Sequence, residues 1–389
     1  RDFFYAPNMH GVDWKAMRDQ YAKLLPHVRH RNDLTYVIGE LIGELNVGHA
    51  YISGGDRPTV ERIPMGLLGA RYARDASGYY KITEIIKGAN WSKPHRSPLT
   101  EPGVEVSEGD YIIAINGQDV SQLEHMNQAL IGTADQQTEL LVNDSPKKDG
   151  ARRTVVVPRS DEADLYYHAW VRGNIEKVTE MSDGRIGYVH VPDMSPRGLN
   201  EFVRYFYPQL NREALIIDVR GNGGGNVSPM IIERLQRKLA MIQMGRNLSP
   251  YPNPFQMVVG PKVMLHDRYS ASDGDLVNWR FKAYDLGPTI GERSWGGVVG
   301  IRGSLPFIDG ADLRKPEFAP YDTEGKNWII EGYGVDPDIE VVNAPHEEYK
   351  GKDAQLERSV EELKKLMKQQ PTKVPPIPPY PDRARQPKD

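Results

Sequence analysis

Two strand–loop–helix units that follow one another constrain the fold of this chain most strongly. In the first, the apolar run 214–219 leads into the glycine-rich loop 220–225 and then into a helical pattern from Ser228. In the second, the apolar run 263–265 leads into the loop 269–275 and another helical pattern. Units of this kind predict parallel neighbouring strands whose loops meet at the carboxyl edge of one sheet. The predicted fold class is therefore α/β, within a multidomain α+β chain.

Ser272 lies in the second loop, where the predicted helix begins. Free backbone N–H groups and the positive end of the helix dipole converge at such a position, which favours an oxyanion. Ser272 is therefore a candidate nucleophile, and the glycine run is a candidate part of its oxyanion hole. A serine at this position is more commonly only an N-cap.

Changes in hydrophobic pattern and composition divide the 389 residues into four parts. We predict an N-terminal helical segment over 1–62, a β-patterned domain over 63–160, the catalytic α/β domain over 161–370 and a proline-rich tail over 371–389. Asp13 and Asp353 are expected to cap helices, and a further helix is expected to start at Asn32 or Asp33.

The β-patterned part resembles a PDZ domain. Its run Ile112–Ile115 followed by Asn116-Gly117 predicts a strand closed by a hairpin turn. In such a domain the loop Gly66-Leu67-Leu68-Gly69 can receive a peptide carboxylate while the peptide adds a strand to the sheet edge. A role as a spacer or lid is equally supported.

His49 follows the turn Asn46-Val47-Gly48 at the end of a helical pattern. A histidine in a glycine-flanked turn is held by its neighbours and stays reachable, which suits a general base. Taken alone, such a histidine is more often a surface or packing residue. Glu331 taken alone is likewise compatible with a solvated turn.

Three separated motifs together resemble the tricorn branch of peptidase family S41. They are Gly48-His49-Ala50-Tyr51 before the PDZ-like part, Ser272-Asp273-Gly274-Asp275 after it, and the segment 331–337 near the C-terminal end. Most S41 peptidases use a serine–lysine dyad, but Gly297 occupies the place where that lysine would fall. The likeness extends over about residues 4–342.

The resemblance implies roles for three residues: Ser272 as nucleophile, His49 as general base and then acid, and Glu331 as the group that orients the imidazole. It implies that the N–H of Asp273 and an N–H of the run 223–225 form the oxyanion hole, with Gly223 or Gly224 favoured. The tricorn branch has a serine before its histidine where this chain has Gly48. The link between Glu331 and His49 is therefore expected to be direct, through water, or weakened.

Composition excludes several other classes of function. A formal net charge of -4 without a long basic run gives no reason to expect nucleic acid, and no apolar stretch is long enough to predict membrane insertion. The absence of cysteine removes thiolate chemistry. The glycine run lacks the Lys-Ser/Thr ending of a phosphate loop, and His346 lacks the second histidine of a zinc helix.

The sequence therefore predicts a serine peptidase that needs no cofactor or metal and acts on peptides through an acyl-enzyme. The resemblance further implies a homo-oligomer and β-propellers preceding this region. Separately, the sequence begins at Arg1 and no signal-peptide pattern follows, so the natural N-terminus is expected to be missing. The compartment stays open between cytoplasm and periplasm. Two alternatives are a weak or inactive ligand-binding protein on the same fold and a peptide-capturing scaffold.

Overall fold

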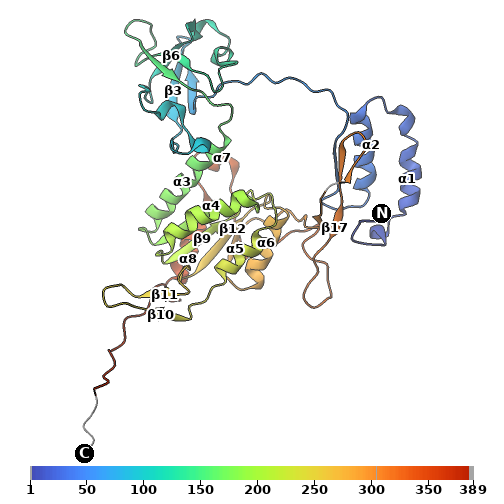
Figure 1. Cartoon of the computed structure of the whole chain (residues 1–389), viewed down its shortest axis with the longest axis vertical. Helices are drawn as coiled ribbons and strands as arrows, with labels where there is room; N and C mark the ends of the chain where they lie inside the picture. The colour runs from blue at the N-terminus through green and yellow to red at the C-terminus, as the bar shows by residue number, and fades with distance from the viewer. Residues whose placement is uncertain (1, 304, 385–389) are drawn as a thin grey trace, which may run out of the picture. The chain divides into compact units, whose positions relative to one another are not determined.

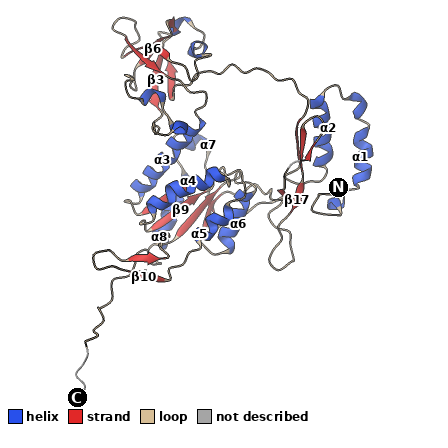
Figure 2. Ribbon diagram, viewed as in Figure 1, coloured by secondary structure: helices blue, strands red, loops and turns tan. Residues whose placement is uncertain are grey.

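A computed structural model describes residues 2–303 and 305–384 of the chain, so the end of the predicted tail, 385–389, lies outside the described residues. The described residues separate into two compact units, one formed by 2–58, 175–303 and 305–384 and the other by 59–174. Figure 1 shows the course of the chain by colour, and Figure 2 distinguishes its helices from its strands. The four-part division 1–62, 63–160, 161–370 and 371–389 stays a prediction.

A five-stranded parallel sheet forms the centre of the first unit. Its strands, in spatial order, are β18 (Ile339–Glu340), β13 (Thr289–Gly291), β12 (Lys262–His266), β9 (Ala214–Asp218) and β8 (Ile186–His190). β9 and β12 pair in parallel, with Leu215 opposite Lys262. The predicted parallel pairing of the two strand–loop–helix units is thereby confirmed.

Helices supply the apolar cover that a buried parallel sheet needs. The first unit carries α4 (Pro196–Phe206), α5 (Ser228–Leu235), α6 (Asp273–Ala283) and α8 (Ala354–Leu366), and Val178 near the end of α3 (Ala163–Met181) is also buried in the core of the sheet. Leu356, Val360 and Leu363 of α8 join Ile216 and Val263 of the sheet in one buried cluster. Asp353 caps α8 by accepting the N–H of Leu356, as predicted.

The N-terminal segment of this unit carries α1 (Trp14–Ala22) and α2 (Arg31–Gly43), followed by β1 (Tyr51–Gly54). Asp13 caps α1 as predicted, but α2 begins earlier than expected because His30, rather than Asn32 or Asp33, is its N-cap. The remaining elements are small: β16 (Ala311–Arg314) and β15 (Leu305–Pro306) extend β1, β10 (Met241–Gln243) pairs with β11 (Tyr251–Asn253), β14 (Gly300–Ile301) pairs with β17 (Pro316–Phe318), and α7 spans Pro345–Glu348.

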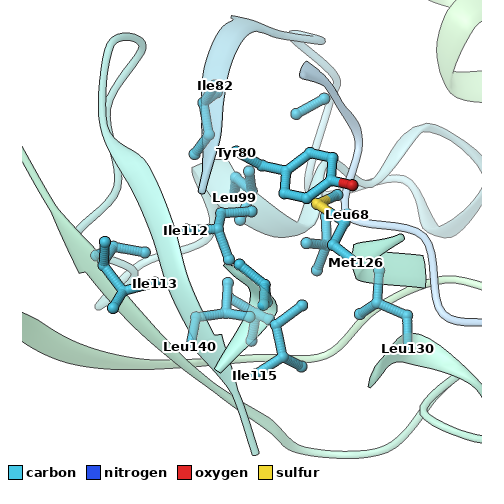
Figure 3. Close-up of a cluster of buried hydrophobic side chains, with 14 of the residues drawn as sticks. Leu68, Tyr80, Ile82, Leu99, Ile112, Ile113, Ile115, Met126, Leu130 and Leu140 are labelled. Carbon is cyan, nitrogen blue, oxygen red and sulfur yellow. The ribbon is translucent and has the colours of Figure 1, made fainter. Parts of the chain in front are cut away.

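The unit 59–174 contains a six-stranded antiparallel sheet with its own core. Its strands are β2 (Ala70–Arg74), β3 (Tyr80–Ile85), β4 (Tyr111–Ile115), β5 (Gln118–Asp119), β6 (Thr138–Asn143) and β7 (Arg152–Val156), and α3 (Ala163–Met181) follows them. Asn116 and Gly117 both have positive φ between β4 and β5, which confirms the predicted hairpin turn. Figure 3 shows the core of this unit around Ile112, Ile115 and Leu140, whose side chains are fully buried.

Candidate active site

Ser272 lies just after β12 and is the N-cap of α6. Its backbone has φ 60° and ψ -119°, a region that residues with a side chain rarely adopt. The backbone N–H of Ser272 donates to Oδ2 of Asp275 at 2.8 Å, which helps to hold this conformation. A serine kept in such a strained turn at the carboxyl edge of a sheet is consistent with a functional residue.

The glycine loop approaches Ser272 closely. A Cβ built on Gly224, where φ is +96°, would lie only 2.6 Å from Cβ of Ser272, so only glycine fits there. The two loops are also joined directly, because the N–H of Ala271 donates to the carbonyl of Asn222 at 2.8 Å. The predicted meeting of the two loops at one sheet edge is therefore observed.

Backbone N–H groups suitable for an oxyanion differ in their availability. The N–H of Gly224 donates to Oδ1 of Asn222 at 2.9 Å. Across residues 2–303 and 305–384, no acceptor is recorded for the N–H of Gly223 or for that of Asp273 at the start of α6. Of the two glycines that the sequence favoured, Gly223 is thus the better placed donor, and its role stays a prediction.

The Asp273 side chain is anchored on a neighbouring helix. Its carboxylate accepts the backbone N–H of Ser228 at 2.9 Å and the Ser228 hydroxyl at 2.5 Å. Arg280 adds a third bond at 3.0 Å. The start of α6 is therefore fixed against the start of α5, and the direction of the Asp273 N–H is fixed with it.

His49 lies in the turn between α2 and β1, half-buried beside two aromatic rings. The centroids of Tyr51 and Trp295 are each 6.0 Å from that of the imidazole. Burial lowers the pKa of His49 below its ordinary value of 6.5, and the Glu331 carboxylate opposes this shift. A neutral imidazole near pH 7 can accept a proton.

Glu331 is held by three backbone N–H groups. Oε1 accepts from Gly48 at 2.7 Å, while Oε2 accepts from Val298 at 2.6 Å and from Val299 at 2.9 Å. Nδ1 of His49 is buried and has no hydrogen-bond partner in the part of the chain that the structure describes. Glu331 therefore acts on His49 through its charge and through the Gly48 backbone, with no direct hydrogen bond to the imidazole.

Asp275 connects these parts of the site, and the sequence reasoning assigned it no role. Besides the N–H of Ser272, its carboxylate accepts the Ser294 hydroxyl at 2.5 Å and the N–H groups of Gly296 and Gly297 at 2.9 and 3.3 Å. Gly297 in turn packs on the histidine turn, since a Cβ on Gly48 would lie 3.0 Å from its Cα. An aspartate at the third position after an N-cap serine is the available sequence signal.

The lysine of the S41 dyad has no equivalent in this geometry. A Cβ built on Gly297 would lie 2.0 Å from the Trp295 ring, so the observed backbone and ring leave no room for a side chain. His49 lies beside this loop, with its imidazole centroid 6.0 Å from that of Trp295. The structure brings the turn of His49, Glu331 and the loop of Ser272 together through residues 294–299.

In the unit 59–174, the loop 66–69 that was predicted to receive a peptide carboxylate makes hydrogen bonds within the chain instead. The N–H groups of Gly66, Leu67 and Gly69 donate to the Leu130 carbonyl, the Arg159 carbonyl and Oε1 of Glu162, at 2.8, 2.7 and 2.5 Å. Leu68 is the remaining member of the loop. In this structure the loop therefore does not offer these three N–H groups to a peptide, and the predicted role of Gly66, Leu67, Leu68 and Gly69 stays a prediction.

Neither metal ligands nor membrane helices are found in the described residues. No group of three or more His, Asp or Glu side chains there is arranged to hold a metal ion. No helix within 2–303 and 305–384 has the length and apolar character needed to cross a bilayer.

Three family models match successive parts of the chain. Residues 1–43 match the tricorn protease C1 domain, residues 66–161 the tricorn protease PDZ domain, and residues 185–341 peptidase family S41. These matches confirm the predicted resemblance, and they support the α/β core with an inserted PDZ-like domain.

Individual relatives match over nearly the whole chain. Tricorn protease homolog 1 of Streptomyces coelicolor is 38% identical over 379 residues, which are 97% of this chain and 35% of that protein. A putative tricorn-like protease C-terminal subunit of Sulfurisphaera tokodaii is 38% identical over 350 residues, 90% of this chain and 40% of that protein. The crystal structure of the tricorn protease matches with a TM-score of 0.88 at 33% identity, covering 94% of this chain and 35% of that one. The chain spans little more than a third of the length of these relatives.

Proposed function

We propose that this chain, which resembles the tricorn proteases and carries a peptidase family S41 domain, is a serine peptidase that cleaves peptide bonds through an acyl-enzyme. The observation that carries the proposal is the convergence of three distant segments on the loop 294–299. Asp275 ties the Ser272 turn to this loop, Gly297 packs on Gly48 beside His49, and Glu331 binds both Gly48 and Val298.

The chemical roles follow from the groups present. Ser272 attacks the scissile carbonyl, and His49 takes the hydroxyl proton and returns it to the leaving amine. The N–H groups of Asp273 and Gly223 receive the oxyanion, since one belongs to each loop and neither has a recorded acceptor among the described residues. Water then hydrolyses the acyl-enzyme, with His49 again acting as base.

Glu331 has an electrostatic role in this mechanism. Its charge raises the pKa of His49 against the effect of burial, and it therefore stabilises the imidazolium that forms when Ser272 loses its proton. The imidazole tautomer, in contrast, is not fixed by a bond from Nδ1. Activity is expected to be lower than in a peptidase whose histidine is directly hydrogen-bonded to a carboxylate.

The second candidate is a weak or inactive peptide-binding protein on the same fold. The observation that favours it is the same unpartnered Nδ1 of His49 together with the saturation of Glu331 by backbone N–H groups. The retained serine, histidine and glutamate favour the peptidase. In both cases the proposed ligands are peptides. The homo-oligomer and the preceding β-propellers of a longer protein stay predictions drawn from the resemblance.

Covalent labelling separates the two candidates. A fluorophosphonate probe is expected to modify Ser272 of the full chain, with the site identified by peptide mass spectrometry, and His49→Ala is expected to lose most of the labelling rate. The same preparation should hydrolyse members of a fluorogenic peptide library, whereas Ser272→Ala should not. A wild-type chain that takes no label and cleaves no peptide would establish the binding protein instead.

A further inference from the structure

A cavity of about 220 Å³ lies in the unit 59–174, beside the predicted carboxylate loop. Leu68, Tyr72, Tyr80, Met126 and Glu162 are among the side chains that line it. Its volume is below the roughly 300–1,000 Å³ of sites that enclose whole small molecules. The cavity therefore has the size for one side chain of a bound peptide.

The cavity presents a carboxylate where a PDZ-like domain would be expected to offer free N–H groups. Oε1 of Glu162 accepts the N–H of Gly69 at 2.5 Å, and the N–H of Leu67 is paired with the Arg159 carbonyl. A carboxylate ligand placed here would face the charge of Glu162 instead of free donors. The local charge thus disfavours an anion and favours a cation.

Glu162 lacks a compensating ion pair. No salt bridge to its carboxylate is recorded among the described residues, and burial raises its pKa above the ordinary value of 4.5. The nearby guanidinium of Arg159 opposes that shift, but it is committed to backbone carbonyls, including those of Asp161 and Arg96 at 2.7 and 2.8 Å. A cation from outside would relieve the cost of this half-buried charge.

Two hydroxyl groups at the cavity also lack partners. The phenolic oxygens of Tyr72 and Tyr80 are buried without a hydrogen bond in the described part of the chain, and the Tyr80 side chain is 4% exposed. Figure 3 shows the Tyr80 ring beside Leu68 and Met126, with its hydroxyl at the margin of the apolar cluster. Buried hydroxyl groups are normally hydrogen-bonded, so the oxygens of these two can accept hydrogen bonds from a bound group.

His125 completes the polar lining. Its Nδ1 accepts the backbone N–H of Asn127 at 3.1 Å, and its ring packs edge-on against Tyr80 with the centroids 5.5 Å apart. The imidazole is exposed at the mouth of the cavity. The deeper lining is apolar, which suits the methylene stem of a long basic side chain.

We propose that this cavity binds a lysine or arginine side chain of a peptide, with Glu162 as counter-ion and the Tyr72 and Tyr80 hydroxyls as acceptors. The PDZ-like domain would then select peptides by an internal basic residue instead of a C-terminal carboxylate. The proposal does not rest on hydrolysis, because binding is measured with Ser272 replaced.

The test is fluorescence anisotropy with the full chain carrying Ser272→Ala, so that no peptide is cut. Four fluorescein-labelled peptides share one neutral sequence: three are amidated with lysine, norleucine or glutamate at one position, and the fourth is the norleucine peptide with a free C-terminal carboxylate. The lysine peptide is expected to bind about tenfold or more tightly than the norleucine peptide, as a charged hydrogen bond would give. The glutamate peptide should bind most weakly.

Variants locate the effect. Glu162→Gln keeps an acceptor for the Gly69 N–H and removes the charge, so it should bring the lysine peptide to the affinity of the norleucine peptide. Glu139→Gln makes the same change on β6, away from the cavity lining, and should leave binding unchanged. Tyr80→Phe should weaken lysine binding severalfold without lowering the melting temperature, because it removes an unsatisfied hydroxyl.

Several results would overturn the proposal. They are equal affinities for the lysine and norleucine peptides, tightest binding of the free-carboxylate peptide, unchanged binding by Glu162→Gln, or no binding of any peptide. The comparison of peptides uses the unaltered cavity, so a variant that fails to fold does not prevent the decision. Labelling of Ser272 in the wild-type chain reports on the peptidase separately.

Discussion

Gly48 decides how the candidate base and acid are linked. A Cβ at this position would lie 3.3 Å from Oε1 of Glu331 and 3.4 Å from the Trp295 ring, so a serine hydroxyl built there would be close to the carboxylate. As the site stands, Oε1 accepts the Gly48 N–H, and Nδ1 of His49 has no hydrogen-bond partner among the described residues. The missing atom lies where a bridge between the acid and the imidazole would be expected.

Gly48→Ser should therefore raise kcat/KM for a fluorogenic peptide relative to Gly48→Ala by about tenfold, the worth of one added charge-assisted hydrogen bond. The alanine variant is the matched control, because both substitutions bring a Cβ to 3.0 Å from Cα of Gly297. Equal rates for the two variants would show that the hydroxyl forms no useful link.

The pH dependence of kcat/KM should report the environment of His49. Burial lowers its pKa below 6.5, and a general base must be neutral, so activity should persist to a pH below 6.5 before it falls. Glu331→Gln removes the influence that raises this pKa, so its acid limb should move to still lower pH while the rate drops. His346→Ala, a change at an exposed histidine, should leave the profile unchanged. An acid limb above pH 6.5 in the wild type would contradict the prediction.

At the scale of elements, the loop 294–299 brings together segments that are distant in sequence. Asp275, in the first turn of α6, accepts hydrogen bonds from Ser294, Gly296 and Gly297, and Glu331 accepts those of Val298 and Val299. Two buried or half-buried carboxylates thus replace the ladder hydrogen bonds that this irregular loop cannot make. The shape of the site depends on these two side chains.

Asp275→Asn should lower the free energy of unfolding by about 2 kcal/mol and also reduce kcat, because its amide NH₂ cannot accept from a buried donor. Chemical denaturation and peptide hydrolysis measure the two effects. Asp285→Asn, at an exposed position just after α6, is the control and should change neither. If Asp275→Asn kept both stability and kcat, the carboxylate would have no positioning role.

On the scale of the whole molecule, each compact unit has a separate hydrophobic core. The cluster around Ile112 and Leu140 contains only residues of the unit 59–174, whereas Tyr188, Ile216 and Leu363 belong to the core of the other unit. Each unit is therefore expected to bury its own apolar surface.

Ile112→Ala should destabilise the unit 59–174 by about 2–5 kcal/mol, since a fully buried side chain leaves a cavity. Hydrogen exchange followed by mass spectrometry should show faster exchange in peptides from β4 and β6. Peptides from β9 and β12 serve as the internal reference and should exchange as in the wild type. Faster exchange in all of these peptides would contradict the separation of the cores.

Much of this organisation was predictable from local patterns. The apolar runs 214–219 and 263–265 predicted β9 and β12. Asp13 and Asp353 were correctly predicted as helix caps, and Asn116-Gly117 as the hairpin turn. The start of α2 was predicted too late because His30 caps it, and a histidine is a weak cap signal compared with Asn or Asp. Local sequence patterns predict structure well where neighbouring residues alone supply the hydrogen-bond partners of the backbone.

The sequence by itself determined the strand–loop–helix units, their parallel order and which residues could supply the chemistry, because periodicity, turn residues and motif spacing act over short distances along the chain. Tertiary structure alone decided that Glu331 binds backbone N–H groups instead of His49, that Gly224 donates to Asn222, and that Glu162 occupies the loop expected to bind a carboxylate. Each of these is a competition among donors and acceptors from distant segments. Its outcome depends on which groups the folded chain brings within hydrogen-bonding distance.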